Sequence, residues 1–159
     1  MENTTKIEPT YVTFKQAKLL KEKGFDEACS HYYINDFQNF KHDGILYKCG
    51  LPDSEKHKNT FQFVRRKNQL HICNAPEHWQ VVNWLLINHN IWVTADVDCR
   101  DFFDANLLFF FRICDIGENL KCIYSSTEKY YKTPKEAYSA AFDYILNNKI
   151  IWKNYHNIL

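Results

Sequence analysis

Four acidic side chains lie close together in the sequence, at a spacing that could bind a metal ion. They lie in the segment "ADVDCRDFFD", as Asp96, Asp98, Asp101 and Asp104. Asp96 and Asp98 alternate on a predicted strand and so share one face, where two carboxylates could hold Mg²⁺ as in a nuclease. Asp is also common at strand ends and turns for conformational reasons alone. Because no Glu-x-Lys pattern follows at a nuclease spacing, a metal-dependent nuclease is the least favoured function.

Cysteine and histidine alternate in two short segments, "CSH" with Cys29 and His31 and "HIC" with His71 and Cys73. Two such pairs could build a Cys₂His₂ zinc site, or one pair a nucleophile with its base. The usual zinc spacings within a turn are missing, and nothing marks a cysteine as activated. The six cysteines contain no C-x-x-C pair, and no apolar leader is expected at the start of the chain. We therefore predict reduced, mostly buried thiols in a cytosolic protein, with no catalytic residue, metal or cofactor.

The basic residues Arg65, Arg66 and Lys67 lie at the predicted tip of a hairpin over residues 61–73. Phenylalanines lie beside them on the strands, so positive charge and aromatic rings come together. That combination is typical of surfaces that bind nucleic acid by charge and stacking. A solvated turn explains the same residues. Nucleic-acid binding through this hairpin is therefore kept as an alternative function.

Residues 75–147 are predicted to follow the order helix, three strands, helix, which resembles a double-stranded-RNA-binding domain. Such domains are known for a Gly-rich approach and a lysine pair at the start of the last helix. Here Lys132 and Lys135 remain, but the glycines are absent and Glu136 lies among the lysines. Residues 75–148 carry six Lys and Arg against ten Asp and Glu, a net charge of −4. Counterion release therefore favours little RNA affinity on this surface.

Capping signals define the first helix, predicted over residues 14–23. Thr13 and Gln16 have the spacing of a capping box, and Gly24 suits the left-handed position after the last turn. A second helix over 134–147 begins with Thr133 at the N-cap and a proline in the first turn. These signals are local, so they predict helix positions without any knowledge of the fold.

The remaining pattern predicts an α+β protein with antiparallel sheet and about three helices. Strands are expected at 28–34, 45–49, 61–65, 69–73, 91–97, 107–114 and 120–125, and a further helix at 76–89, with Asn74 or Ala75 as its cap. The order is α-β-β-β-β-α-β-β-β-α. We expect one domain over 1–159, flexible at 1–10, with 75–147 as an α-β-β-β-α subunit and 150–159 packed back as a strand or short helix. No run is long enough to predict a membrane helix.

The helix predicted at 76–89 contains no Lys or Arg. It is either buried on two sides or offers an apolar face to a partner. Trp and Tyr are the usual anchors of protein interfaces. The predicted partner-binding residues are Trp84, Val81, Leu85, Tyr130 and Tyr131.

Three segments carry a resemblance over most of the chain: "VTFKQAKLLKEKGFDEACSHYY", "APEHWQVVNWLLINHNI" and "YKTPKEAYSAAFDYIL". They are similar to the "TFEQAKLLKEKGF", "WLREKHNI" and "TPEEALEAAI" patterns of small proteins from phages and prophages of gut bacteria. The middle of the chain, 34–72, matches least. The resemblance implies the cytoplasm of an infected or lysogenic bacterial cell and supplies no catalytic residue. The favoured function is a non-enzymatic phage-encoded accessory protein that binds a host or phage protein.

Overall fold

The computed structural model describes residues 9–36, 45–48, 69–98, 107–117, 121–148 and 150. Within these ranges the chain forms three helices and two antiparallel sheets of three strands each. The elements are α1 (Phe14–Glu22), β1 (His31–Asp36), β2 (Ile45–Lys48), β3 (Gln69–Asn74), α2 (His78–His89), β4 (Ile91–Val97), β5 (Phe109–Asp115), β6 (Lys121–Ser125) and α3 (Pro134–Asn147). The predicted α+β class is confirmed.

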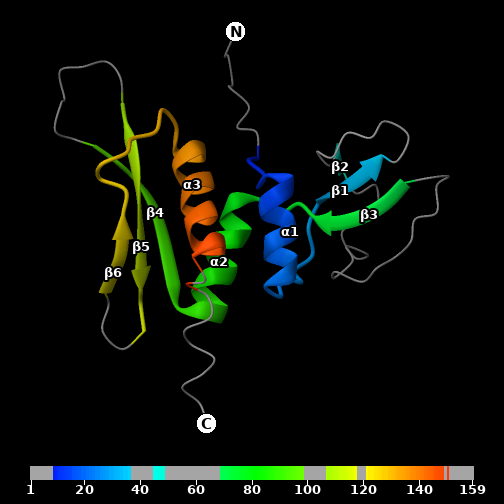
Figure 1. The fold of residues 1–159 in the computed structure, drawn as a ribbon, viewed down its shortest axis with the longest axis horizontal. Helices are drawn as coiled ribbons and strands as arrows, with labels where there is room; N and C mark the ends of the chain where they lie inside the picture. The colour runs from blue at the N-terminus through cyan, green and yellow to red at the C-terminus, as the bar shows by residue number, and fades with distance from the viewer. Residues whose placement is uncertain are drawn as a thin grey trace, which may run out of the picture.

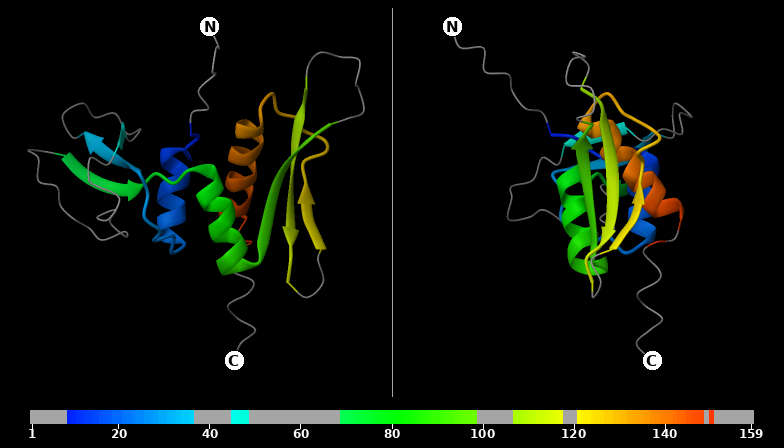
Figure 2. Two further views of the ribbon diagram at one scale, coloured as in Figure 1. Left: turned by 180° about the vertical axis from the view of Figure 1, so that it is seen from behind. Right: turned by 90° about the vertical axis from the view of Figure 1, so that its left-hand side faces the viewer.

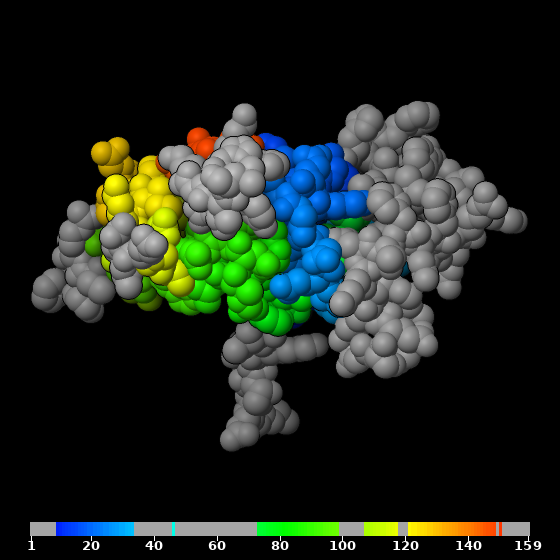
Figure 3. Space-filling view, turned by 90° about the horizontal axis from the view of Figure 1, so that it is seen from below, coloured from blue at the N-terminus to red at the C-terminus, as the bar shows by residue number. Residues whose placement is uncertain are grey.

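The helices lie between the two sheets (Figures 1 and 2). One sheet has the strand order β2-β1-β3 and the other β4-β5-β6. The helix α3 packs on β4 and β5, and α2 lies beside β4. The helix α1 contacts both α3 and β3. In a view from below, α1 and α2 form one continuous surface with the β4–β6 sheet (Figure 3). The β4–β6 sheet therefore buries one face against helices, and β3 of the other sheet contacts α1.

Local capping explains α1. The Thr13 hydroxyl accepts from the Gln16 N–H (3.3 Å), and the Gln16 side-chain oxygen accepts from the Thr13 N–H (2.9 Å), which completes the capping box. After the helix, Gly24 has a φ of 90°, a left-handed conformation that favours glycine. The predicted helix over 14–23 is confirmed to within one residue.

The start of α2 corrects the prediction. The helix begins at His78, with Glu77 as N-cap, and not at Pro76 with Asn74 or Ala75 as cap. The reason is non-local. The backbone of Pro76 accepts from the Val12 N–H (3.1 Å), and Tyr11 and Glu77 form an antiparallel bridge. Pairing with this earlier segment holds residues 76 and 77 in an extended conformation.

The other described elements lie within three residues of their predicted positions. The strand β1 begins at residue 31 and not 28, because two side chains bind the carbonyls before it. Asn74 donates to the Glu27 oxygen (3.0 Å) and Gln80 to the Ala28 oxygen (3.1 Å). The strand predicted at 61–65 and nearly all of the tail at 150–159 lie outside the described residues, and the single-domain organisation stays a prediction.

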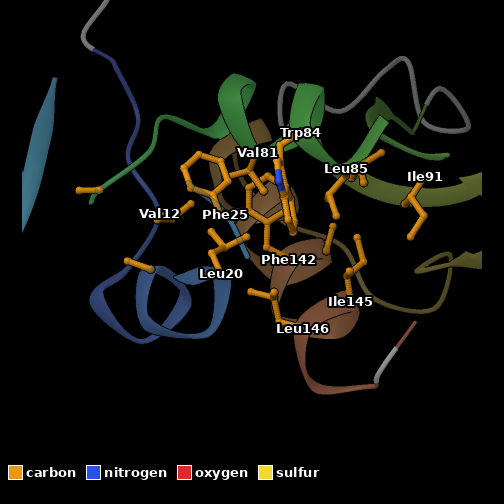
Figure 4. Close-up of a cluster of buried hydrophobic side chains, with 14 of the residues drawn as sticks. Val12, Leu20, Phe25, Val81, Trp84, Leu85, Ile91, Phe142, Ile145 and Leu146 are labelled. Atoms are coloured by element: carbon orange, nitrogen blue, oxygen red, sulfur yellow. The ribbon is translucent and has the colours of Figure 1, made fainter. Parts of the chain in front are cut away.

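The core lies between the three helices and on the face of the β4–β6 sheet that α3 covers (Figure 4). Its largest fully buried side chains include Phe142, Leu20, Leu85, Ile113 and Ile145. Phe25, from the segment after α1, packs edge-on against Trp84 of α2 with ring centroids 5.5 Å apart. The aromatic content of the chain is thus partly used to fill the space between helices.

One polar side chain crosses this core. Gln16 of α1 is fully buried, and its Nε2 donates to the Ser139 carbonyl (2.8 Å), the Ser139 hydroxyl (3.0 Å) and the Asp143 carboxylate (3.0 Å) of α3. Its oxygen meanwhile holds the Thr13 N–H. Both ends of the amide are satisfied, as a buried amide requires.

Replacement of Gln16 by Met should therefore destabilise the protein although the side-chain volume is nearly kept. The Thr13 N–H and the acceptors on α3 would lose their partner, at a cost of about 1–3 kcal/mol in the free energy of unfolding. Urea denaturation followed by circular dichroism measures this difference. Thr13→Ala, which removes only the cap hydroxyl, is the matched control with an expected loss of about 1 kcal/mol. A Gln16→Met protein as stable as wild type would contradict the assigned role.

Candidate binding groove

An open groove of about 750 Å³ lies where the start of α2, the start of α3 and β4 meet. Its lining is mostly apolar and aromatic. The lining residues come from the segment before α1, from α2, from β4 and from α3: Pro9, Thr10, Glu77, His78, Trp79, Val82, Asn83, Trp92, Thr133, Pro134, Lys135 and Tyr138. The volume is in the range of sites that hold small molecules or peptide segments.

An extended segment fixes one wall of the groove. The Thr10 carbonyl accepts from the His78 N–H (2.9 Å), so the first turn of α2 is tied to residues 10–12. The Tyr33 hydroxyl of β1 donates to the Val12 carbonyl (2.6 Å) and holds the same segment from the other side. The wall is thus joined by hydrogen bonds to both α2 and the β1–β3 sheet.

Two exposed tryptophans line the groove. Trp79 is 63% exposed and Trp92 is 39% exposed. The indole N–H of Trp79 donates to the Glu77 carboxylate (2.7 Å), which restricts the orientation of the ring. Large exposed aromatic side chains in one concave site are unusual on a surface that contacts only water.

His78 is the only buried residue among those that line the groove, with 5% of its surface exposed. Its ring lies edge-on to Phe142 (5.3 Å between centroids) and near Tyr138 (6.2 Å). Burial and then the nearby Lys135 lower the pKa of His78 to about 4, against a backbone hydrogen bond with Tyr11 that raises it. The ring is therefore neutral at pH 7, and its Nδ1 is buried without a hydrogen-bond partner among the described residues.

The structure corrects the partner-binding residues predicted on α2. Val81, Trp84 and Leu85 are 1%, 4% and 1% exposed and belong to the core. Trp84 packs against Phe25 and, at 4.6 Å between centroids, against His89. These three side chains cannot anchor a partner in the folded protein. The helix is apolar because the segment after α1, α3 and β4 all pack around it, and its exposed stripe carries Trp79, Asn83 and Ile87 instead.

Tyr130 and Tyr131, the other two predicted partner residues, are half-buried. Tyr131 pairs with Phe109 in an antiparallel bridge, and its ring lies 6.0 Å from that of Phe111. It therefore extends the β4–β6 sheet. Neither tyrosine lines the groove.

One member of the acidic cluster, Asp96, forms an ion pair. Asp96 accepts from the Arg112 Nε (2.8 Å) and from the Thr94 hydroxyl (2.8 Å) on the open face of the sheet. Burial raises the pKa of Asp96, but these partners outweigh it and leave the pKa below its ordinary value. Asp101 and Asp104 lie outside the described residues, and within the described part of the chain no three His, Cys, Asp or Glu side chains are grouped to hold a metal.

Cys29 and Cys73 have the environment of structural thiols. Both are buried, and burial raises the pKa of each to about 12, so neither is a thiolate at neutral pH. The His31 ring lies tilted against the Tyr11 ring, with 4.3 Å between centroids, and its Nδ1 lies 3.0 Å from the Ser30 hydroxyl. The burial predicted for most cysteines holds for these two, whereas Cys122 is exposed.

The basic hairpin residues Arg65, Arg66 and Lys67 lie outside the described residues, so that alternative stays a prediction. Lys132 and Lys135 are exposed at the start of α3, where the Lys132 N–H donates to the Glu136 carboxylate (2.9 Å). Glu136, the acid that weakened the RNA-binding interpretation, thus forms a hydrogen bond with the backbone just before α3.

The groove itself was missed by the sequence analysis. Its walls come from residues 9–10, 77–83, 92 and 133–138, which meet only through the fold. One signal was available: Trp79 is a large aromatic residue within the first turn of a helix, next to an acidic N-cap. Helical periodicity alone does not distinguish its stripe from that of Trp84.

Comparisons with known proteins give no family for this chain. No protein-family model matches it, and neither the curated proteins nor the solved structures contain a significant match. Among the described helices, none has the length and apolar character needed to cross a membrane.

Trp84→Ala should reduce the free energy of unfolding far more than Trp79→Ala. Removal of the buried Trp84 ring leaves a cavity between α1, α2 and α3, at a cost of about 3–5 kcal/mol. Removal of the exposed Trp79 ring should change the free energy of unfolding by about 0.5 kcal/mol or less. Thermal and urea unfolding measure both. Equal losses in the two variants would contradict the burial described above.

His78 should make stability depend on pH. The pKa of His78 is about 4 in the folded protein and near the ordinary 6.5 in the unfolded chain. Between these values the unfolded chain binds more protons, so stability is complete above pH 6.5 and falls as the pH is lowered towards 4. The expected loss from pH 6.5 to 4.5 is about 2 kcal/mol. Urea denaturation across this range measures it.

His78→Phe is the control for that slope. It keeps an aromatic ring against Phe142 and removes the titrating group, while all other titrating groups remain. Burial also lowers the pKa of His89, and that residue is present in both proteins. The difference between the two pH profiles therefore reports His78 alone. Identical slopes would show that His78 is protonated equally in the folded and unfolded states.

Proposed function

We propose that this protein is a non-enzymatic, phage-encoded accessory protein that binds an extended segment of a host or phage protein in the groove. The observation that carries the proposal is the pair of exposed tryptophans, Trp79 and Trp92, in one concave apolar site. Indole rings in a preformed groove are typical anchors of protein recognition. The resemblance to small phage and prophage proteins supports the cellular setting of the proposal.

The composition of the groove favours a peptide with apolar or proline anchors. Aromatic-lined grooves bind extended, proline-containing segments because these segments lose little conformational entropy on binding. Trp79, Trp92 and Tyr138 supply the rings, and Glu77 and Lys135 add one charge of each sign. A groove with balanced charge has no general attraction for nucleic acid, which favours a protein partner over a polyanion.

The titratable groups of the groove also favour binding. His78 is neutral, and its Nδ1 is buried beneath the surface of the groove. The Thr133 hydroxyl is engaged as the N-cap of α3, where it accepts from the Glu136 N–H (3.2 Å). Cys29 and Cys73, both buried thiols, are not among the residues that line the groove. The lining residues thus offer surface for contact more than groups placed for proton transfer.

Selection from a displayed library of random 12-residue peptides tests the proposal. Peptides are selected on the wild-type protein and counter-selected on Trp79→Ala. We expect enriched sequences with Pro, Leu or aromatic anchors that bind with micromolar dissociation constants. Trp79→Ala should weaken them at least about 30-fold, the loss of a residue that contributes 2 kcal/mol or more.

Ile87→Ala is the matched control for this experiment. Ile87 lies on the same exposed stripe of α2 and is 68% exposed, but it does not line the groove. Peptides that bind in the groove should bind Ile87→Ala as they bind wild type. If no sequence is enriched, or if enriched peptides bind Trp79→Ala and wild type equally, the groove is not a peptide site.

A further inference from the structure

Two cysteines face each other on the open side of the β4–β6 sheet. Cys114 of β5 is directly opposite Cys122 of β6 in the antiparallel register. Their neighbours Phe111 and Ile113 point to the other side and are 3% and 0% exposed beneath α3. Cys122 is exposed and Cys114 is partly exposed, and both are free thiols.

A bulge creates this pairing. The register joins Ile113 to Tyr124 but Cys114 to Cys122, so that Ile123 is an extra residue in β6. In a regular strand, Cys122 and Tyr124 would lie on the same face. The bulge reverses that relation. The Tyr124 ring stacks on Tyr144 of α3 at 4.0 Å, while Cys122 lies opposite Cys114 on the outer face.

The hydrogen-bond pattern of the sheet shows that this pair is close. The Asp98 N–H, after β4, donates to the Leu108 carbonyl, and the Ile116 N–H donates to the Asn90 carbonyl, before β4, each at 2.8 Å. Backbone groups alternate in direction along a strand, so the N–H and C=O of even-numbered residues near β5, such as Cys114, point towards β4. Cys114 therefore has no backbone hydrogen bond to Cys122, and the two form a non-hydrogen-bonded pair between β5 and β6. In such pairs the Cα atoms are about 4.5 Å apart and the side chains approach most closely. That separation is within the range spanned by disulfides.

The surroundings of the two thiols differ. Burial and the adjacent Cys122 raise the pKa of the Cys114 thiol, and the nearby guanidinium of Arg112 partly offsets this. The exposed Cys122 is therefore the thiol that a reagent in solution reaches first. The strand β6 is also an edge strand whose residues 121–124 are all exposed (yellow in Figure 3). Few buried contacts hold it, so a covalent link would change its stability directly.

We propose that Cys114 and Cys122 are a modification site at which a low-molecular-weight disulfide, such as glutathione disulfide, installs a reversible cross-strand disulfide. The Cys122 thiolate attacks one sulfur of the reagent, forms a mixed disulfide and releases one glutathione thiolate. The Cys114 thiolate then attacks the Cys122 sulfur and releases the second glutathione thiolate. The two protein thiols lose two protons and two electrons, and the reagent is reduced to two thiols. Exposed disulfides of this kind are the readily reducible, regulatory ones.

The experiment treats the folded protein with glutathione disulfide and maps the products by mass spectrometry. Cys49→Ser with Cys99→Ser leaves only the four cysteines that the structure describes. We expect the intact mass to fall by two hydrogens, with peptides containing Cys114 and Cys122 joined, and dithiothreitol should reverse the change. The same mapping on the wild-type chain gives the result if the double variant does not fold.

Cys114→Ser is the matched control, in which Cys122 should stop at the glutathione adduct and the mass should rise. Hydrogen exchange of the β6 amides should slow at least about tenfold in the oxidised protein and not in this control. A glutathione adduct that persists on Cys122 while Cys114 is present would overturn the proposal. So would a disulfide to Cys29 or Cys73, or no reaction of the folded protein.

Discussion

The buried amide of Gln16 is the interaction on which the arrangement of the helices depends. Its nitrogen holds Ser139 and Asp143 of α3, and its oxygen holds the first turn of α1. A buried amide that lost either set of partners would be costly, so α1 can pack on α3 in only one position along its axis. Since α1 also contacts β3, this side chain helps to position the β1–β3 sheet relative to α3.

The position of α1 then determines the environment of α2. The segment before α1 pairs with residues 76–78, and Phe25 after α1 covers Trp84. With α3 and β4 on its other sides, α2 leaves only a narrow stripe exposed. An apolar helix without Lys or Arg is thus explained by burial. The groove is lined by Trp79 of α2 and Trp92 of β4, and both are exposed, whereas Trp84 is buried against Phe25.

Local signals predicted most of the fold from the sequence. The Thr13 capping box, Gly24 and the Thr133 cap act within a few residues, and they placed α1 and α3 correctly. The errors have non-local causes. Glu77 became the cap of α2 because residues 76 and 77 pair with residues 11 and 12. Periodicity identified the stripes of α2 but not which of them faces inward, because that depends on three other elements. The groove and the cysteine pair could not be predicted, since one needs four separate segments and the other needs a bulge that reverses the alternation of β6.

The groove and the cysteine pair share one row of the sheet, because Trp92 is opposite Cys114 and Cys114 is opposite Cys122. The two strand pairings that this row crosses, β4–β5 and β5–β6, differ in extent. Seven consecutive residue pairs, from Ile91–Asp115 to Val97–Phe109, join β4 to β5, so Trp92 is held in register whatever the state of the thiols. The β5–β6 pairing is shorter and interrupted by the bulge. A disulfide would therefore strengthen the shorter β5–β6 pairing and leave the β4–β5 pairing unchanged. Oxidation should restrict the edge strand without moving Trp92, so the proposed peptide binding and the proposed disulfide formation should be separable although both use residues of this row.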